Sequence, residues 1–159
     1  MQIIFHIDLN AFYASAEMAN DSSLEGKPLV ISGNNRRAIV STASYEARKY
    51  GVHSAMPIRM ALRLCPQAII LRGDHDSYIK HSEQVTEIID ERAPLFEKSS
   101  IDEFYLDLTG MDKYFGCMKW STELRQTIIK ETGLPISFGL SINKIVSKVG
   151  TNEAKPNGT

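Results

Sequence analysis

The sequence lacks most of the features that would set it apart from ordinary globular proteins. Its 159 residues include two cysteines, Cys65 and Cys117, and no CxxC pair, which argues against a disulfide framework or a zinc site. No apolar run approaches the roughly 18 residues of a membrane-spanning helix. The N-terminal "MQIIFHIDL" lacks the basic segment and cleavage site of a signal peptide. We therefore expect a cytoplasmic protein without membrane association.

An excess of basic residues is also missing. The 18 Lys and Arg against 19 Asp and Glu give a net charge of −1. This balance argues weakly against a protein that grips DNA unaided, because such proteins are usually basic. With 43% hydrophobic residues, the chain can form one sizeable core, or a small core plus an insert. Its last turn signal, "KPNG", has no element after it, so we expect a piece of a longer protein.

Apolar periodicity and turn residues predict alternating strands and helices. Strands are expected at 2–9, 29–32, 38–42, 68–72, within 99–110 and at 135–141. Helices are expected at 11–19, 43–51, 58–64 with Pro57 at N1, 77–92, around 124–129 and at 142–154. The turn at 33–37 should join two strands into a hairpin.

This order is βα, an insert, then αββαβα. It favours an α+β fold, because strands and helices mix without regular βαβ alternation. The expected architecture is a ferredoxin-like palm with a mostly antiparallel sheet, interrupted by a small α/β subdomain.

Three acids at predicted strand ends form the first candidate site. Asp8 ends the first strand, while Asp102 and Glu103 open a later one, and strand ends of one sheet can converge. Three such carboxylates would raise one another's pKa unless cations neutralised them, and oxygen-only ligation selects Mg²⁺ or Mn²⁺. A two-metal carboxylate site suits in-line phosphoryl transfer. Equally, Asp8 could cap the next helix, and the other two could be surface acids of a hairpin.

Strand geometry raises an objection to this site. Successive side chains of a strand point to opposite faces of the sheet, so Asp102 and Glu103 would point away from each other. Both can serve one site only if the backbone turns there, and the preceding "SSID" leaves room for a turn. We therefore expect a backbone turn at 101–103.

The segment "STASYEARKYG" is a candidate anion site. Thr42, Tyr45 and Arg48 lie three apart at the start of a predicted short helix, so a hydroxyl, a phenol and a guanidinium share one side of it. Lys155, beside the "KPNG" turn, could add a further positive charge. The alternative is an ordinary amphipathic turn in which Arg48 and Lys155 are simply solvated.

Aromatic residues follow Asp8 at once. Phe12 or Tyr13 could stack on a nucleotide sugar, although aromatics at a helix start more often belong to the core. His6 and Asp8 share a strand face, so an HxD metal pair is conceivable, but a lone strand histidine is more often packing.

Four stretches together resemble the Y-family translesion DNA polymerases, of the bacterial DNA polymerase IV type. They are "HIDLNAFYASAE", "STASYEARKYGVHSAMPIRMALRLCP", "SIDEFYLDLTG" and "GLSINKIVSKVGTNEAKPNG". They cover nearly the whole chain in the family's order and spacing. The resemblance implies template-directed, error-prone DNA synthesis across lesions in DNA repair, with primer-template DNA and dNTP as substrates and two Mg²⁺ ions, for which Mn²⁺ can substitute.

The resemblance also implies roles for individual residues. Asp8, Asp102 and Glu103 would be catalytic and bind the metals together with the Leu9 carbonyl. Tyr13 would be the steric gate against ribose, with Phe12 beside the sugar. The remaining nucleotide-binding residues would be Thr42, Tyr45, Arg48 and Lys155 on the triphosphate, and Ile39 and Ser41 over the base pair.

By the same resemblance, 1–19 and 74–159 would form the palm, truncated at its C-terminal end, and 20–73 the fingers. The thumb and little-finger domains, and a C-terminal region that binds the sliding clamp, would be missing. We expect a monomer, weakly active or inactive as this piece alone. Two departures are Asn10, where bacterial relatives often have Asp, and Phe104, where a small Ala is common; Phe104 should add bulk beside the metal site.

Two other functions stay open. Another palm-fold nucleotidyl transferase, such as a nucleotide cyclase, also uses paired acids, but would not need Tyr13, the "SYEAR" segment or the insert. A non-catalytic nucleotide-binding module would not need the full acid set.

Overall fold

The computed structural model describes residues 2–33, 37–93, 95–110, 116–155 and 158. The chain divides into two compact units, one of Met1–Asn10 with Ile79–Thr159 and the other of Ala11–Tyr78. A division into two parts was expected, but the first helix, α1, groups with the second unit rather than with the first. The domain boundaries at 19/20 and 73/74 stay a prediction.

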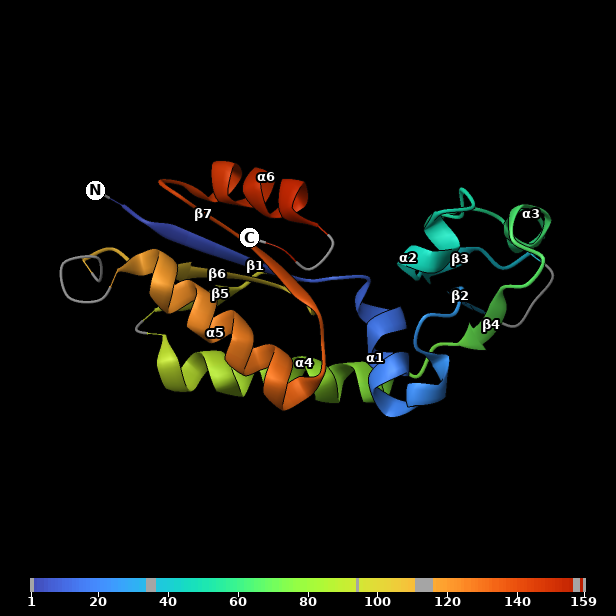
Figure 1. The fold of residues 1–159 in the computed structure, drawn as a ribbon, viewed down its shortest axis with the longest axis horizontal. Coiled ribbons are helices and arrows are strands. Elements are labelled where there is room, and N and C mark those ends of the chain that lie inside the picture. Colours follow the sequence, from blue (N-terminus) through green and yellow to red (C-terminus); the bar gives the residue numbers. More distant parts are fainter. Residues whose placement is uncertain (1, 34–36, 94, 111–115, 156–157, 159) are drawn as a thin grey trace. The chain divides into compact units, whose positions relative to one another are not determined.

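The first unit is a four-stranded antiparallel sheet with helices on both faces (Figure 1). The strand order is β5-β6-β1-β7, and α4 and α5 lie on one face while α6 lies on the other. Its elements are β1 (Ile4–Leu9), α4 (His75–Arg92, whose first turn belongs to the second unit), β5 (Phe96–Lys98), β6 (Glu103–Asp107), α5 (Cys117–Thr132), β7 (Ile136–Ser141) and α6 (Lys144–Ala154).

Strand β1 is buried at every position because both faces of the sheet are covered. Phe5 contacts the ring of Trp120 in α5, whereas His6 is hydrogen-bonded to Thr151 in α6. The pleat therefore sends Ile4, His6 and Asp8 toward α6 and the alternate residues toward α4 and α5. Apolar composition predicted the strand, and the two polar residues within it lie on the α6 side.

The predicted element order and the antiparallel sheet are confirmed. The predicted order contains two strands after α4, but a residue range was predicted only for the second. Strand β5 is the first of the two. It has three residues, all partly exposed at the sheet edge, so it carries no apolar periodicity. The second strand begins only at Glu103, and Ser99 to Asp102 precede it.

Helix α6 packs unusually close to the sheet. A Cβ added to Gly139 of β7 would overlap the Ser147 carbonyl oxygen and lie 2.6 Å from the Thr151 nitrogen, and Gly150 faces Gly139 from the helix. Ser147 and Thr151 are consequently fully buried. The helix begins at Asn143, whose side chain accepts a hydrogen bond from Val146 N at 2.9 Å.

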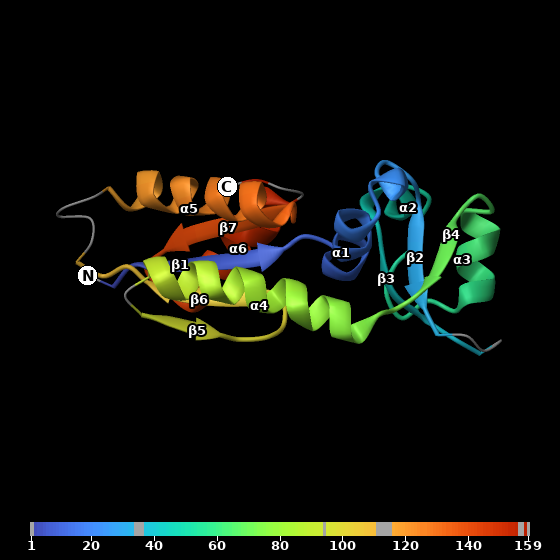
Figure 2. The ribbon, with the colours of Figure 1, turned by 90° about the horizontal axis from the view of Figure 1, so that it is seen from below.

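The second unit contains a small mixed sheet of order β3-β2-β4 (Figure 2). Strands β2 and β3 form the predicted antiparallel hairpin, and β4 is parallel to β2. Of the hairpin turn, residues 34–36 lie outside the described residues. The elements are α1 (Phe12–Asn20), η1 (Ser22–Leu24), β2 (Leu29–Ser32), β3 (Val40–Ala43), α2 (Tyr45–Arg48), α3 (Ile58–Leu64) and β4 (Ile69–Arg72).

Helix α3 has the predicted bounds, 58–64, but Pro57 is its N-cap rather than its N1 residue. Its buried Ala61 joins Val30, Val40 and Met56 in a core beneath this sheet. None of the helices that the structure describes is both long and apolar enough to cross a membrane.

The glycine contact between α6 and β7 can be tested by substitution. Gly139→Ala should lower the free energy of unfolding by roughly 1–3 kcal/mol or more, because the methyl group would meet helix backbone that cannot move aside alone. Chemical denaturation measures the change. Gly116→Ala is the control, since nothing lies within 4 Å of a Cβ built there, and an equal loss in both variants would contradict the close approach.

Candidate active site

The structure brings the three predicted acids together at one end of the first unit's sheet. Asp8 and Glu103 are direct cross-strand partners of β1 and β6, so both side chains lie on the α6 face. The Leu9 N–H donates to the Asp102 carbonyl at 2.9 Å, which places Asp102 beside the same strand end. Burial raises the pKa of Asp8, and the pKa stays raised although Lys155 lowers it; the charges of Asp102 and Glu103 add smaller rises. We call these three residues the acid cluster.

A bend before β6 explains how two consecutive residues reach one site. The Glu103 carbonyl accepts hydrogen bonds from Ser99 N at 3.0 Å and Ser100 N at 3.4 Å, and Ile101 O accepts one from Ser82 Oγ at 2.5 Å. Asp102 therefore lies in the bend rather than in the strand, and alternation does not apply to it. The predicted backbone turn is confirmed.

The Asp102 carboxylate is oriented from within the bend. Ser100 Oγ donates to Asp102 Oδ1 at 2.9 Å. Burial raises the pKa of Asp102 despite this hydrogen bond, and the charge of Glu103 adds to the rise. The folded chain thus holds a carboxylate whose ionised form is unfavourable without a nearby cation.

The expectation that Phe104 crowds the site is wrong. Phe104 is fully buried and pairs with Ile7, so its ring lies on the opposite face of the sheet from Asp8 and Glu103. Asn10 is also buried, and its Oδ1 accepts a hydrogen bond from Ser137 Oγ at 3.0 Å. Both departures from the family pattern are therefore accommodated by packing.

Two lysines at α6 form ion pairs with two of the three carboxylates of the acid cluster. Lys155, at the C-cap of the helix, forms an ion pair with Asp8 Oδ2, and Lys148 Nζ lies 3.1 Å from Glu103 Oε1. Burial alone would raise the pKa of Glu103, but the hydrogen bonds from Lys148 and His6 lower it overall. Sequence patterns missed Lys148, because a helix lysine that is half exposed gives no signal of its own.

His6 is the other residue at the acid cluster that was not expected there. Its ring is fully buried, with Nε2 3.1 Å from Glu103 Oε1 and Nδ1 2.6 Å from Thr151 Oγ1. Both ring nitrogens are thus engaged within the protein, so His6 and Asp8 do not form an HxD metal pair.

The chemistry of the acid cluster fits a hard divalent cation. Within the described ranges, no three His, Cys, Asp or Glu side chains are arranged to hold a metal ion, and ammonium groups lie on Asp8 and Glu103 instead. The available donors are nonetheless carboxylate and backbone oxygens, the ligands that Mg²⁺ and Mn²⁺ prefer. Like charges placed directly opposite across two strands also require positive charge nearby.

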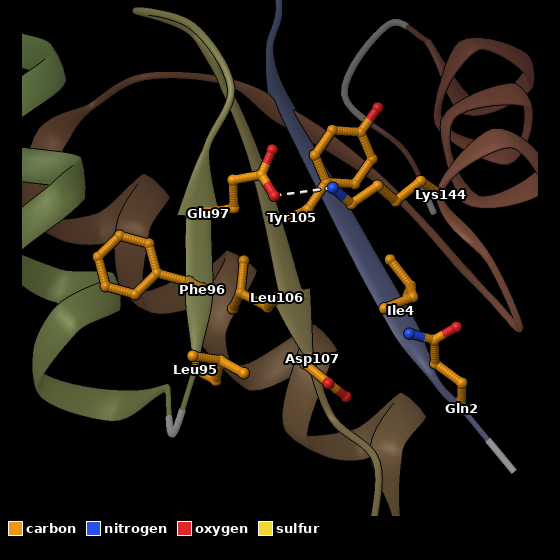
Figure 3. Close-up of a pocket in the computed structure, with 9 residues that line it drawn as sticks. All are labelled: Gln2, Ile4, Leu95, Phe96, Glu97, Tyr105, Leu106, Asp107 and Lys144. Atoms are coloured by element: carbon orange, nitrogen blue, oxygen red, sulfur yellow. Dashed lines mark hydrogen bonds and ion pairs between the residues drawn. The ribbon is translucent and has the colours of Figure 1, made fainter.

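A hollow of about 270 Å³ lies elsewhere on this unit and contains none of the predicted site residues. Figure 3 shows it over β5, β6 and β1, with Lys144 Nζ bound to Glu97 Oε2 at 2.7 Å across it. Its lining is Gln2, Ile4, Leu95, Phe96, Glu97, Tyr105, Leu106, Asp107 and Lys144. We assign the site by the converging acids rather than by this hollow, which has no convergent carboxylates.

In the second unit, Tyr13 is held by stacking. Its ring lies 4.5 Å from the ring of Tyr78 at an interplanar angle of 18°. Tyr78 in turn donates its phenol to Glu17 Oε1 at 2.7 Å, and burial raises the pKa of this phenol. Phe12 is buried and contacts both rings. The predicted steric gate therefore has a fixed ring orientation, to which sequence patterns gave no clue because Tyr78 matched an ordinary core position.

The three predicted triphosphate residues of the second unit lie on two elements instead of one helix. Thr42 is part of β3, whereas Tyr45 and Arg48 begin and end α2. Arg48 Nε donates to the Ala43 carbonyl at 2.9 Å, and its guanidinium lies 4.8 Å from the centre of the Tyr45 ring. Thr42 lies in a strand, as the predicted strand at 38–42 has it, but the expectation that it shares one side of a helix with Tyr45 and Arg48 is wrong, because Ser44 is the N-cap of that helix.

Residues expected over the base pair precede this segment. Ile39 and Ser41 are both exposed, so they are accessible to a ligand. Their assignment as the roof of a nucleotide site stays a prediction, as do the roles of the other site residues.

The fold is similar to that of known DNA polymerases. The solved insertion ternary complex of Dbh DNA polymerase superposes with a TM-score of 0.93 at 31% identity, over 98% of this chain and 47% of that one. The model of the impB/mucB/samB family matches residues 7–152. The chain therefore belongs to this family, and the predicted resemblance to Y-family polymerases is confirmed.

Over almost the whole length of this chain, curated relatives have nearly half of the aligned residues identical to it. DNA polymerase IV of Treponema denticola is 45% identical over 99% of this chain, and that of Listeria monocytogenes serotype 4a is 46% identical over 98%. The chain spans 40% and 44% of the lengths of these two relatives.

Because the ionised form of Asp102 is unfavourable in the folded chain, we expect that removing its charge stabilises the fold. Without divalent cations, Asp102→Asn should raise the free energy of unfolding at pH 7 by about 0.5–2 kcal/mol. Because folding raises the pKa of Asp102, its ionised form costs stability above the unfolded-state pKa near 4, and the gain should vanish below about pH 4. Denaturation as a function of pH measures this.

Asp107→Asn, at the far end of β6, is the matched control. Hydrogen bonds from Thr109 lower the pKa of Asp107, so this variant should gain no stability at pH 7. A loss of stability in Asp102→Asn at pH 7, or a gain that persists unchanged at pH 3, would contradict the assignment of burial as the cause.

Proposed function

We propose that the protein carrying this chain is a template-directed DNA polymerase that transfers a nucleotide from dNTP to a primer 3′-OH, in error-prone synthesis across DNA lesions. The observation that supports it most is the acid cluster, three carboxylates converging where β1 and β6 meet, in a chain of the impB/mucB/samB family. The relatives named DNA polymerase IV and the Dbh polymerase complex support the same reaction.

The acid cluster would hold two Mg²⁺ ions, or Mn²⁺ in their place. Asp102 and Glu103 would bind the ion at the primer 3′-OH, and Asp8, Asp102 and the Leu9 carbonyl the ion of the nucleotide. When bound, such ions lower the pKa of the attacking hydroxyl and stabilise charge on the attacking and leaving oxygens. The apolar strands beneath keep the carboxylates in place.

The reaction forms a bond between the primer 3′ oxygen and the α-phosphorus, breaks the bond from that phosphorus to the β-phosphate oxygen, and releases pyrophosphate. Charge that develops on the leaving group needs positive partners. Thr42, Tyr45, Arg48 and Lys155 would bind the triphosphate, with Lys155 exchanging its bond to Asp8 for one to phosphate. Ile39 and Ser41 would cover the base pair.

Several wider expectations follow from the same proposal. The protein would bind primer-template DNA, act as a monomer in the cytoplasm, and reach the sliding clamp through a region outside this chain. Low fidelity and lesion bypass rest on the likeness to Y-family polymerases.

Removing either of two acids tests the site. In the protein that carries this chain, Asp102→Ala and Glu103→Ala should each slow primer extension at least about 100-fold, since charge stabilisation of the transferred phosphoryl group would be lost. Extension of a labelled primer with Mg²⁺ measures the rate. Asp107→Ala, at the far end of β6 and outside the acid cluster, should retain near-normal extension, and full activity of either acid variant would refute the assignment.

Substitution of Tyr13 tests the steric gate. Tyr13→Ala should permit incorporation of ribonucleotides, because the phenol ring would no longer occupy the space of the ribose 2′-OH. Single-nucleotide incorporation with rNTP and dNTP gives the ratio of kcat/KM values. Tyr50→Ala removes a half-exposed tyrosine of the same unit and should leave the ratio unchanged. Continued exclusion of rNTP by Tyr13→Ala would count against the gate.

A further inference from the structure

His6 is a buried titratable residue that the proposed mechanism does not use. It lies in the middle of β1, fully buried, on the same face as Asp8. Its two ring nitrogens contact two different elements, with Nε2 on Glu103 of β6 and Nδ1 on Thr151 of α6. A buried ring needs partners at its nitrogens, and here one of the two partners is a carboxylate of the acid cluster, which connects His6 to the site.

The partners determine where the ring proton lies. An ionised carboxylate only accepts hydrogen bonds, so the 3.1 Å contact with Glu103 Oε1 requires a hydrogen on Nε2. In the neutral ring Nδ1 is then an acceptor for the Thr151 hydroxyl at 2.6 Å, and the single hydrogen of that hydroxyl is also within reach of the Ser147 carbonyl at 2.9 Å and the His6 carbonyl at 3.2 Å. The chain of bonds thus runs from Thr151 through the ring to Glu103, and the requirement for Nε2–H is the same in the charged ring.

Packing holds the ring in this orientation. His6 pairs with Gly139 in the β1–β7 register, and the absence of a side chain there lets α6 bring Thr151 onto the ring. Tyr105 lies on the other side, with ring centroids 4.7 Å apart. Thr151 Oγ1 also lies 2.9 Å from the Ser147 carbonyl and is fully buried, so its position is fixed.

Within the described residues, the contacts to Glu103 converge on one of its two oxygens. His6 Nε2 and Lys148 Nζ both reach Oε1 at 3.1 Å. Because Oε1 is held from the protein side, the carboxylate has a defined rotamer, and Oε2 is the oxygen available to a divalent cation. Partners that orient a ligating carboxylate in this way usually affect metal affinity.

We propose that His6 is a positioning residue of the acid cluster, holding the Glu103 carboxylate through Nε2–H for a divalent cation, with Thr151 supporting the ring at Nδ1. This inference rests on the proposed function and concerns the same site. It assigns His6 no contact with the reacting atoms.

Mn²⁺ binding without nucleotide provides a readout besides activity. In the protein that carries this chain, His6→Leu should weaken Mn²⁺ binding roughly 10- to 100-fold, as loss of an outer-shell partner does elsewhere. His6→Gln, whose amide can donate to Glu103 from a similar position, should restore affinity to within about threefold. Electron paramagnetic resonance of free Mn²⁺ measures both, and kcat should fall in His6→Leu with KM for dNTP nearly unchanged.

Thr151→Val tests the second bond with almost no change in side-chain shape. It should weaken Mn²⁺ binding less than His6→Leu does and shift the ring nitrogen resonances of ¹⁵N-labelled His6. Ser121→Ala, which removes another fully buried hydroxyl from the same unit, should change neither measurement. Denaturation of every variant separates misfolding from a local effect. If His6→Leu does not fold, the Mn²⁺ affinities of Thr151→Val and His6→Gln still test the positioning role of His6.

The outcomes separate this inference from the proposed function. If Glu103→Gln leaves Mn²⁺ affinity and primer extension unchanged, the metal site itself is wrong. If Glu103→Gln weakens both but His6→Leu and His6→Gln bind Mn²⁺ like the parent, only the positioning role is overturned. An unprotonated Nε2 in the parent protein would overturn it as well.

Discussion

The near contact between α6 and β7 is the constraint on which the site depends. Gly139 and Gly150 let two backbones approach to a distance that no other residue at 139 would allow. As a result Lys148, Thr151 and the helix end at Lys155 all face the strand ends that carry the acid cluster. A helix one side chain farther from the sheet would leave Asp8 and Glu103 opposite each other without their present partners.

Several contacts, rather than a single strong one, offset the burial and mutual repulsion of the carboxylates in the acid cluster. Asp8 and Glu103 have opposite shifts in pKa, although they are cross-strand partners. The difference arises because Glu103 accepts from two donors while Asp8 is more deeply buried and relies on Lys155. Unfavourable charge of this kind is expected where a protein retains a group for function rather than for stability.

Much of the fold and the site could be predicted from the sequence. Apolar runs and helix periodicity predicted nearly every element, and the acids at strand ends predicted their own convergence. The turn before Glu103 was also expected, because Asp102 and Glu103, as neighbours in a regular strand, would point to opposite faces of the sheet and could not share a site. These features depend on local patterns, which a single sequence contains.

Features that depend on distant contacts could not be predicted in this way. Thr151 lies 145 residues from His6 along the chain, and Lys148 resembles any solvated helix lysine. Strand β5 is too short for a period, and the expected crowding by Phe104 failed because the strand starts at Glu103, which turns Phe104 to the other face. The packing of α6 on the sheet decides the contacts of Thr151 and Lys148, and the register of β6 decides the face of Phe104; both are properties of the folded chain.

Charge balance links these contacts to the proposed reaction. The three carboxylates and the two lysines leave the cluster about one negative charge in excess. Two divalent cations and a fully ionised triphosphate carry equal and opposite charges, so loading a nucleotide would leave this balance unchanged. Lys155 then needs only to exchange one anionic partner for another, while His6 and Lys148 keep Glu103 oriented. A site arranged in this way can bind and release a highly charged substrate without changing the net charge at this end of the sheet.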